Sequence, residues 1–214
     1  MVVFLVRKGN PKKIQDWKDL ERKDISIISP NPKTSGGGKW NFLAIYGYAL
    51  DKFQGDKEKS FSYLKEFYSR IPVMDTGSRG AAATFIQRNM GDVLLIWESE
   101  AFLALKESSN KNFEIIYPSI TIKTTPVISV VNRSNNLKNT SELSNTYLDF
   151  LYNETSQRIF AESGFRPIHS NISKEFANKF PVVHFFTAEE KFMNWELIQE
   201  EIFEKGKLAD GVLK

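Results

Sequence analysis

The sequence predicts an α/β fold over residues 1–131, followed by a helical segment over residues 132–214. Short apolar runs typical of buried strands alternate with stretches that have the apolar spacing of helices. The connections between them are short, and two contain glycine turns. Alternation of this kind predicts a sheet with helices on both faces. After Asn132 the strand-like runs stop and the composition shifts to Asn, Ser and Lys.

The expected elements follow one another with little spacing. We expect strands at 2–6, 25–29, 73–79 (running into a turn), 93–97, 113–117, 120–124 and 127–131. We expect helical turns or helices at 16–20, 35–50, 57–68, 81–90 and 98–105, and in the second segment at 142–153, 156–162, 173–178 and 189–205. The apolar stripe of the last helix is typical of core or interface packing.

Composition narrows the class of function. The chain has 214 residues, 41% apolar and 26% charged, which suits one large or two small globular domains. A net charge of +3 lacks the strong basic footprint of nucleic-acid binders, so we expect no nucleic-acid partner. There is no cysteine, and the only histidines are His169 and His184, which leaves little for a metal centre or a catalytic triad. We expect no cofactor, no metal and no enzymatic activity.

No stretch is apolar over the length of a membrane span. The N-terminal apolar run ends at Arg7 after six residues, which is too short for the hydrophobic region of a signal peptide. The sequence therefore predicts no membrane helix and no export signal in this chain.

The stretch 30–50 carries the first candidate site. Ser35 stands where a helix N-cap belongs, and Gly36 and Gly37 let a ligand approach the backbone with no Cβ in the way. Free N–H groups at a helix start form a ready anion site. The alternative is a flexible glycine loop before an ordinary surface helix. A nucleotide phosphate loop is excluded, because Trp40 stands where Ser or Thr is required.

Three loops at strand ends offer hydrogen-bond donors. The first has the Ser35 hydroxyl and the N–H groups of Gly36 and Gly37, the second has backbone N–H groups around Ser78, and the third has the indole N–H of Trp97. A site made only of donors suits a fully ionised oxyanion such as sulfate. Hydrogen phosphate carries a proton that would cost about 1–3 kcal/mol if it were left unpaired. Taken alone, Trp97 equally fits a core position and Ser78 an ordinary turn.

Three charged residues flank these loops. Asp75 and Glu98 lie near two of them and could supply an acceptor, so the discrimination between anions depends on where they point. Arg79 could neutralise a bound anion or brace Asp75 or Glu98. We favour the bracing role, because a cation in direct contact would blunt discrimination among anions.

The longer runs resemble one known family. VFLVRKGNPKKIQDWKDL, ISIISPNPKTSGGGKWNFLAIYGYAL, VMDTGSRGAAATFIQRNMGDVLLIWESEAFLAL and YLDFLYNETSQRIFAESGFRP are similar, in order, to the bacterial periplasmic sulfate-binding proteins, the substrate-binding components of sulfate/thiosulfate ABC importers. The resemblance implies a type II periplasmic-binding-protein fold, with two α/β lobes that close on a dehydrated anion. It places ligand contacts at Ser35, Gly36 and Gly37 of TSGGGKW, at the N–H of Ser78 in DTGSRG and at Trp97 of LLIWESE. At the Ser78 position the family commonly has Ala.

One departure from the family is large. Its members carry roughly 80 to 100 further residues, the size of a small domain, before the VFLVRKGNP run. These hold SYDP-type and SHGGSGKQ-type motifs that this chain lacks. We therefore expect a complete second lobe, with residues 132–214 belonging to an incomplete first lobe.

The resemblance also implies a ligand, a protein partner and a cellular location. We expect sulfate or thiosulfate as ligand, the membrane permease of an ABC importer as partner and a periplasmic location. A half-cleft predicts weak binding and self-association through apolar surface. A related oxyanion such as molybdate or phosphate, or a truncated remnant with little binding, are the alternatives; an enzyme acting on phosphate or sulfate esters is disfavoured.

Overall fold

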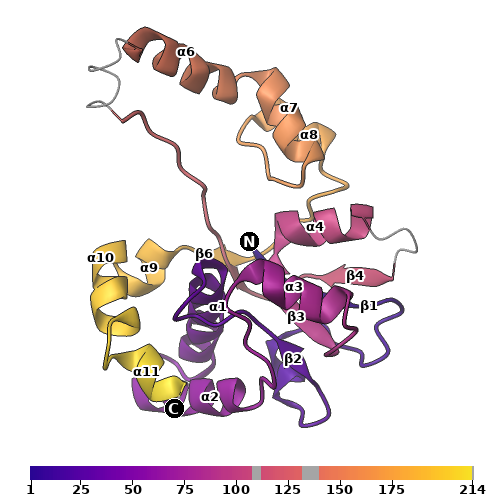
Figure 1. Cartoon of the computed structure of the whole chain (residues 1–214), viewed down its shortest axis with the longest axis vertical. Coiled ribbons are helices and arrows are strands. Elements are labelled where there is room, and N and C mark those ends of the chain that lie inside the picture. Colours follow the sequence, from indigo (N-terminus) through magenta and orange to yellow (C-terminus); the bar gives the residue numbers. More distant parts are fainter. Residues whose placement is uncertain (108–111, 132–139, 214) are drawn as a thin grey trace. The chain divides into compact units, whose positions relative to one another are not determined.

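The computed structural model describes residues 1–107, 112–131 and 140–213 and divides into two compact units (Figure 1). The first unit is Met1–Thr124 with Val183–Lys214, and the second is Thr125–Val182. None of the helices in the described ranges is both long and apolar enough to cross a membrane.

A four-stranded sheet forms the centre of the first unit, in the order β2-β3-β1-β4. The strands are β1 (Val2–Arg7), β2 (Ile27–Ile28), β3 (Val93–Trp97) and β4 (Phe113–Ile116). β2 runs parallel to β3, whereas β1 is antiparallel to β3 and β4. The carboxyl ends of β2 and β3 therefore meet at one edge.

The strand expected at 73–79 is wrong. Val73 makes a single parallel bridge to Ile28, after which the chain turns directly into the next helix. The parallel direction of that bridge still brings this segment out at the same edge as the ends of β2 and β3. Three loops thus leave the sheet together.

Helices cover both faces of the sheet, as expected. Alternate residues of a strand point to opposite faces, so Val2 and Phe4 pack with α1 (Gly36–Lys52) and α2 (Lys57–Ser69). Val3 and Leu5 pack on the other side with α3 (Ser78–Ile86) and α4 (Glu98–Glu107). The 3-10 turn η1 (Trp17–Glu21) inserts Trp17 into the first of these cores.

The middle of helix α1 is buried on all sides and not along one face only. Seven consecutive residues, Asn41 to Gly47, are buried. The reason is the C-terminal segment, which covers the outer side of α1: Phe203 contacts Phe42 and Phe192 stacks on Tyr46. In Figure 1 this yellow segment lies beside α1 and α2, away from β4.

The C-terminal segment is not the single helix expected at 189–205. It consists of α9 (Ala188–Phe192), α10 (Trp195–Ile198), the π-helical η2 (Gln199–Phe203) and α11 (Leu208–Val212). Met193 has a φ of +73°, and Asn194 starts a new helix by accepting from the Leu197 N–H. The cap therefore interrupts an otherwise helical stripe.

The observed units differ from the domain boundary expected at residue 131. Residues 183–214 pack on the first unit because Phe186, Ile198 and Ile202 share its core. β6 (Phe185–Phe186) also pairs with β5 (Thr121–Ile122). The assignment of residues 132–214 to a first lobe stays a prediction.

The second unit contains α6 (Ser141–Tyr152), α7 (Glu154–Glu162) and α8 (Ser170–Glu175). The helices expected at 142–153 and 156–162 are confirmed, and α8 begins three residues before the expected start at 173. The strand expected at 127–131 is wrong: the stretch forms no helix or strand and pairs with no strand in the described part of the chain. No residue of α6 is buried.

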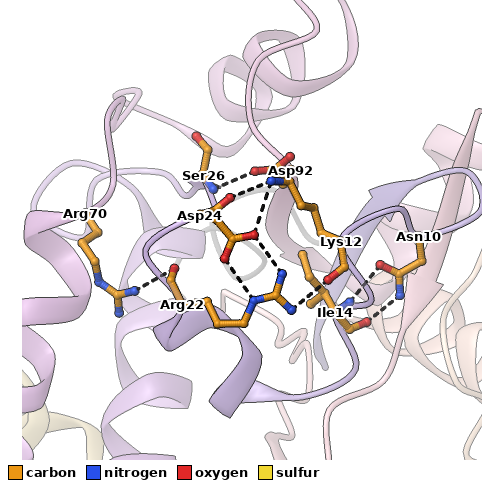
Figure 2. A network of polar contacts seen from close by, with 8 residues as sticks. All are labelled: Asn10, Lys12, Ile14, Arg22, Asp24, Ser26, Arg70 and Asp92. Atoms are coloured by element: carbon orange, nitrogen blue, oxygen red, sulfur yellow. Dashed lines mark hydrogen bonds and ion pairs between the residues drawn. The ribbon is translucent and has the colours of Figure 1, made fainter.

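A polar network fastens the amino edge of the parallel strands (Figure 2). Ser26, just before β2, donates its N–H to Asp92 Oδ2 at 2.8 Å, just before β3. Nearby, Arg22 donates to both carboxylate oxygens of Asp24, and Lys12 Nζ donates to the Asp24 carbonyl at 2.9 Å. The network therefore lies at the edge of the sheet opposite the carboxyl edge from which the three loops emerge.

Candidate anion-binding site

Two of the three loops are bonded to each other at the carboxyl edge. The Asn31 N–H donates to the Asp75 carbonyl at 2.8 Å, and Thr34 Oγ1 donates to the Thr76 carbonyl at 2.9 Å. The Asn31 carbonyl accepts from the Ser35 N–H at 3.0 Å. These bonds set the start of α1 beside the start of α3.

Ser35 is the N-cap of α1. Its backbone is extended and its Oγ accepts from the Gly38 N–H at 3.2 Å, so its hydroxyl hydrogen is left to donate elsewhere. The N–H groups of Gly36 and Gly37 are in the first turn, where a helix provides no partner. Among the described residues neither N–H has an acceptor.

Gly37 lies where the three loops meet. A Cβ on Gly37 would stand 3.0 Å from Trp97 Nε1 and would overlap Ser78 Oγ. A Cβ on Gly36 would instead meet nothing within 4 Å. The structure therefore brings Gly37, Ser78 and Trp97 together around one point, and leaves Gly36 open.

Helix α3 supplies the second set of donors, and it begins at Ser78, three residues before the expected start. Gly77 is its N-cap, with no side chain capping the turn, and the Ala81 N–H donates to the Gly77 carbonyl at 3.1 Å. The N–H groups of Ser78 and Arg79 have no acceptor in the described part of the chain. They lie in the first turn of α3, where the Ser78 side chain is beside Gly37.

The charge at these helix starts favours an anion. Neither α1 nor α3 has an acidic residue in its first turn, whereas α2 carries Glu58 and α4 carries Glu98 and Glu100. The positive ends of the α1 and α3 dipoles are thus not neutralised by an acidic residue within either helix. A ligand anion can take that place.

Trp97 ends β3 and is half-buried. Its ring packs edge-on against Trp40 at 6.2 Å, and Trp40 stacks on Trp195 at 5.1 Å. This packing fixes the ring while the indole N–H, near Gly37, has no acceptor among the described residues. The indole is therefore a positioned donor rather than a plain core group.

Asn41 forms the floor of the site, and sequence reasoning missed it. A recess of about 10 Å³, close to the room for one water molecule, is lined by Asn41 together with Gly37, Ser78 and Trp97. Asn41 is only 3% exposed. The one signal in the sequence was an amide within the otherwise apolar run that follows Trp40.

Hydrogen bonds fix which way Asn41 faces. Its Nδ2 donates to Ser29 Oγ at 3.1 Å and to the Leu95 carbonyl at 3.0 Å. The Leu95 carbonyl can only accept, so the amide nitrogen must point to it. Asn41 Oδ1 remains as an acceptor with no partner in the described residues, on a side chain that lines the recess.

Asp75 and Glu98 flank the site. Asp75 Oδ2 is buried without a hydrogen-bond partner in the described residues, and the Asp75 side chain packs against Gly80 in the first turn of α3. Glu98 is buried, and its N–H donates to the Met1 carbonyl at 2.9 Å.

Arg79 is exposed and is electrostatically coupled to Glu100, a partner that sequence reasoning did not name. Burial raises the pKa of Glu100, and the Arg79 charge lowers it in part. The bracing of Asp75 or Glu98 by Arg79 stays a prediction.

Neither histidine is among the groups that converge at Gly37. His169 lies in the second unit, with Nε2 3.1 Å from the Tyr152 carbonyl, and the His184 carbonyl accepts from the Thr121 N–H. The described ranges contain no group of three or more His, Cys, Asp or Glu residues placed to hold a metal ion.

The sequence matches one protein family and several known proteins. Residues 1–166 match the model of the family described as bacterial extracellular solute-binding protein. The whole chain is 43% identical to the sulfate-binding protein of Escherichia coli strain K12, and 98% of it is 38% identical to the thiosulfate-binding protein of Pseudomonas aeruginosa. It spans 65% and 63% of the lengths of those relatives.

A solved structure shares the fold. The sulfate-binding protein SubI from Mycobacterium tuberculosis H37Rv superposes with a TM-score of 0.78 and 29% identity. The match covers 95% of this chain and 68% of the SubI chain.

Proposed function

Because this chain belongs to the bacterial extracellular solute-binding protein family, we propose that it binds sulfate or thiosulfate without transforming it. The relatives reported above are named as sulfate- and thiosulfate-binding proteins. The proposed contacts to the anion are Ser35, Gly36, Gly37, Ser78 and Trp97. We propose that Asp75, Arg79 and Glu98 do not touch the anion but pack against the residues that do.

One observation carries the proposal: Gly37, Ser78 and Trp97 meet around one point. The N-termini of α1 and α3 face that point together with the indole N–H, and neither helix has an acidic residue in its first turn. The donors are neutral, so they match a dianion by hydrogen bonding and helix dipole, not by a paired cation. Tetrahedral sulfur oxyanions present several oxygens that can accept from such a set.

The expected affinity of the isolated chain is low. Each hydrogen bond in a water-exposed site contributes roughly 0.5–1.5 kcal/mol. Five such bonds total roughly 2.5–7.5 kcal/mol, and the cost of association offsets much of this, so we expect a Kd on the order of 1 mM or weaker. A second lobe that excludes water would strengthen every one of these bonds, since electrostatic interactions grow as the dielectric falls.

Titration of the chain with sodium sulfate tests the proposal. Trp97, Trp40 and Trp195 form one cluster beside the site, so intrinsic tryptophan fluorescence should report binding. Sodium chloride at matched ionic strength is the control, and thiosulfate and hydrogen phosphate are the comparison anions. We expect saturable responses to sulfate and thiosulfate, and weaker ones to hydrogen phosphate. A sulfate response equal to that of chloride would overturn the proposed function.

We further propose a periplasmic location and delivery of the anion to the membrane permease of an ABC importer, in keeping with the solute-binding family. For the chain by itself we propose self-association with a second copy through α6. Leu143, Tyr147 and Phe150 are 70%, 56% and 49% exposed, and their spacing puts them on one face of the helix. Exposed apolar faces of this kind mark interaction surfaces.

A further inference from the structure

Ser78 presents two hydrogen-bonding groups at the site, its backbone N–H and its hydroxyl. The proposed function uses only the N–H. The hydroxyl oxygen lies so close to Gly37 that a Cβ on that residue would overlap it. Trp97 Nε1 would stand 3.0 Å from the same Cβ position. The Ser78 hydroxyl therefore lies among the donors from α1 and β3.

This hydroxyl has no role in holding the fold together. Serine at a helix start often caps the turn, but Gly77 is the N-cap of α3 and no side chain bonds to the turn. Among the residues that the structure describes, none exchanges a hydrogen bond with Ser78 Oγ. The Ser35 hydroxyl differs, because its oxygen already accepts from the Gly38 N–H.

The neighbours of the hydroxyl determine what it can do. Gly37 N–H, Ser78 N–H and the Trp97 indole N–H are all donors, and neither α1 nor α3 has an acidic residue within its own first turn. The Asp75 carboxylate does lie beside the first turn of α3, where it packs against Gly80. An anion oxygen that accepts from the Gly37 N–H and the indole comes within reach of the hydroxyl hydrogen as well. The hydroxyl can rotate to donate to it, since its hydrogen is not otherwise committed.

We propose that the Ser78 hydroxyl donates a hydrogen bond to the bound anion, so that Ser78 supplies two of the donors and its side chain sets affinity. This inference rests on the proposed function, because it concerns the same anion. The competing destination for the hydrogen is Asn41 Oδ1, reached through a water in the recess that Ser78 and Asn41 both line. In that case the side chain contributes nothing to affinity.

Removal of the hydroxyl alone tests the inference. Ser78→Ala keeps the backbone N–H and the room beside Gly37, and Ser99→Ala is the matched control, since Ser99 lies in the first turn of α4. Wild type and both variants are titrated with sodium sulfate at constant ionic strength, and the Tm of each anion-free protein is measured. A hydrogen bond in a water-exposed site contributes about 1.5 kcal/mol at its upper limit, which is roughly tenfold in Kd.

The expected result is about a tenfold weaker Kd for S78A, with a Tm within a few degrees of wild type and S99A unchanged in both. Equal sulfate affinity in S78A and wild type would overturn the inference while leaving the proposed function intact. A loss of affinity matched by a fall in Tm would also overturn it, because the side chain would then be structural. An absence of sulfate binding by wild type would instead refute the proposed function.

Discussion

Gly37 and Ser78 approach so closely that residue 37 has no room for a side chain. A methyl group there would overlap Ser78 Oγ and crowd Trp97 Nε1 at 3.0 Å. The glycine thus does more than leave its own N–H accessible: it permits α1, α3 and the end of β3 to meet. Its neighbour Gly36, with open space around its Cβ position, carries no such requirement.

The first prediction compares these two glycines. Gly37→Ala should displace the Ser78 hydroxyl and the indole, and the loss of two hydrogen bonds of about 1 kcal/mol each weakens sulfate binding roughly 30-fold. Gly36→Ala should leave the Kd within about threefold of wild type, because its methyl meets no atom. The measurement is the sulfate Kd by fluorescence. Similar losses in the two variants would contradict this account of Gly37.

The second prediction concerns Trp97. Trp97→Phe retains an aromatic ring against Trp40 but removes the indole N–H, so sulfate affinity should fall by about tenfold at most, the range of one hydrogen bond. Trp195→Phe, which alters the far side of the same aromatic cluster, is the control and should keep the wild-type Kd. Both are measured by calorimetry, because each removes a fluorophore. An unchanged Kd in W97F would exclude the indole as a contact.

The third prediction places a charge on the floor. Asn41→Asp keeps the shape of the side chain but puts a carboxylate beneath the anion, in a residue 3% exposed. At about 5 Å and an effective dielectric near 20, like charges repel by roughly 3 kcal/mol, so sulfate binding should fall at least 100-fold.

Asn41→Leu separates charge from structure, because it removes the bonds to Ser29 and Leu95 without adding a charge. The unpaired Leu95 carbonyl should cost about 1–3 kcal/mol of stability in either variant. The check is the sulfate Kd against the free energy of unfolding. If N41L and N41D lost affinity equally, Asn41 would affect the site only through the fold.

Local patterns predicted the parts of the site that depend on short stretches of chain. Ser35 before three glycines predicted a capped helix start, and the apolar run that ends at Trp97 predicted a buried strand; both are confirmed. The convergence of the loops required only that their strands be parallel. Resemblance to the family then supplied the residue set, although the contacts themselves remain a proposal.

What the sequence did not predict depends on long-range packing. Asn41 is a floor residue because Ser29 and Leu95 accept from it, and those partners lie 12 and 54 positions away. The helix expected at 189–205 breaks at Met193 because the Asn194 side chain caps a new helix there, although the apolar stripe continues through the break. The expected strand at 127–131 had the right residues but finds no neighbour to pair with in the described part of the chain.

The fourth prediction concerns pH at the opposite edge of the sheet (Figure 2). The hydrogen bond from Arg22 is the main cause that lowers the pKa of Asp24 to about 2. Because this pKa is below the unfolded value of about 3.9, the contribution to stability is present above that value and is lost as pH falls toward 2.

In Arg22→Gln the pKa of Asp24 should therefore rise, measured by NMR titration of its carboxyl carbon, and acid unfolding should begin at higher pH. Sulfate affinity at pH 7 serves as the control, since this network fastens the edge away from the anion site. A pKa for Asp24 that did not move in R22Q would show that another group holds it down.

The fifth prediction tests association through α6. Leu143, Tyr147 and Phe150 form an apolar stripe on a helix with no buried residue, and about a third of the length of the Escherichia coli relative lies outside the part matched here. In the isolated chain a second copy can cover the stripe, so light scattering should show a mass that rises with concentration. Leu143→Ser with Tyr147→Ser should lower that mass toward the monomer, because the apolar area available for burial falls. Glu154→Gln, on neighbouring α7, is the control and should associate as wild type does. A concentration-independent monomer in wild type would refute self-association through this face without bearing on the anion site.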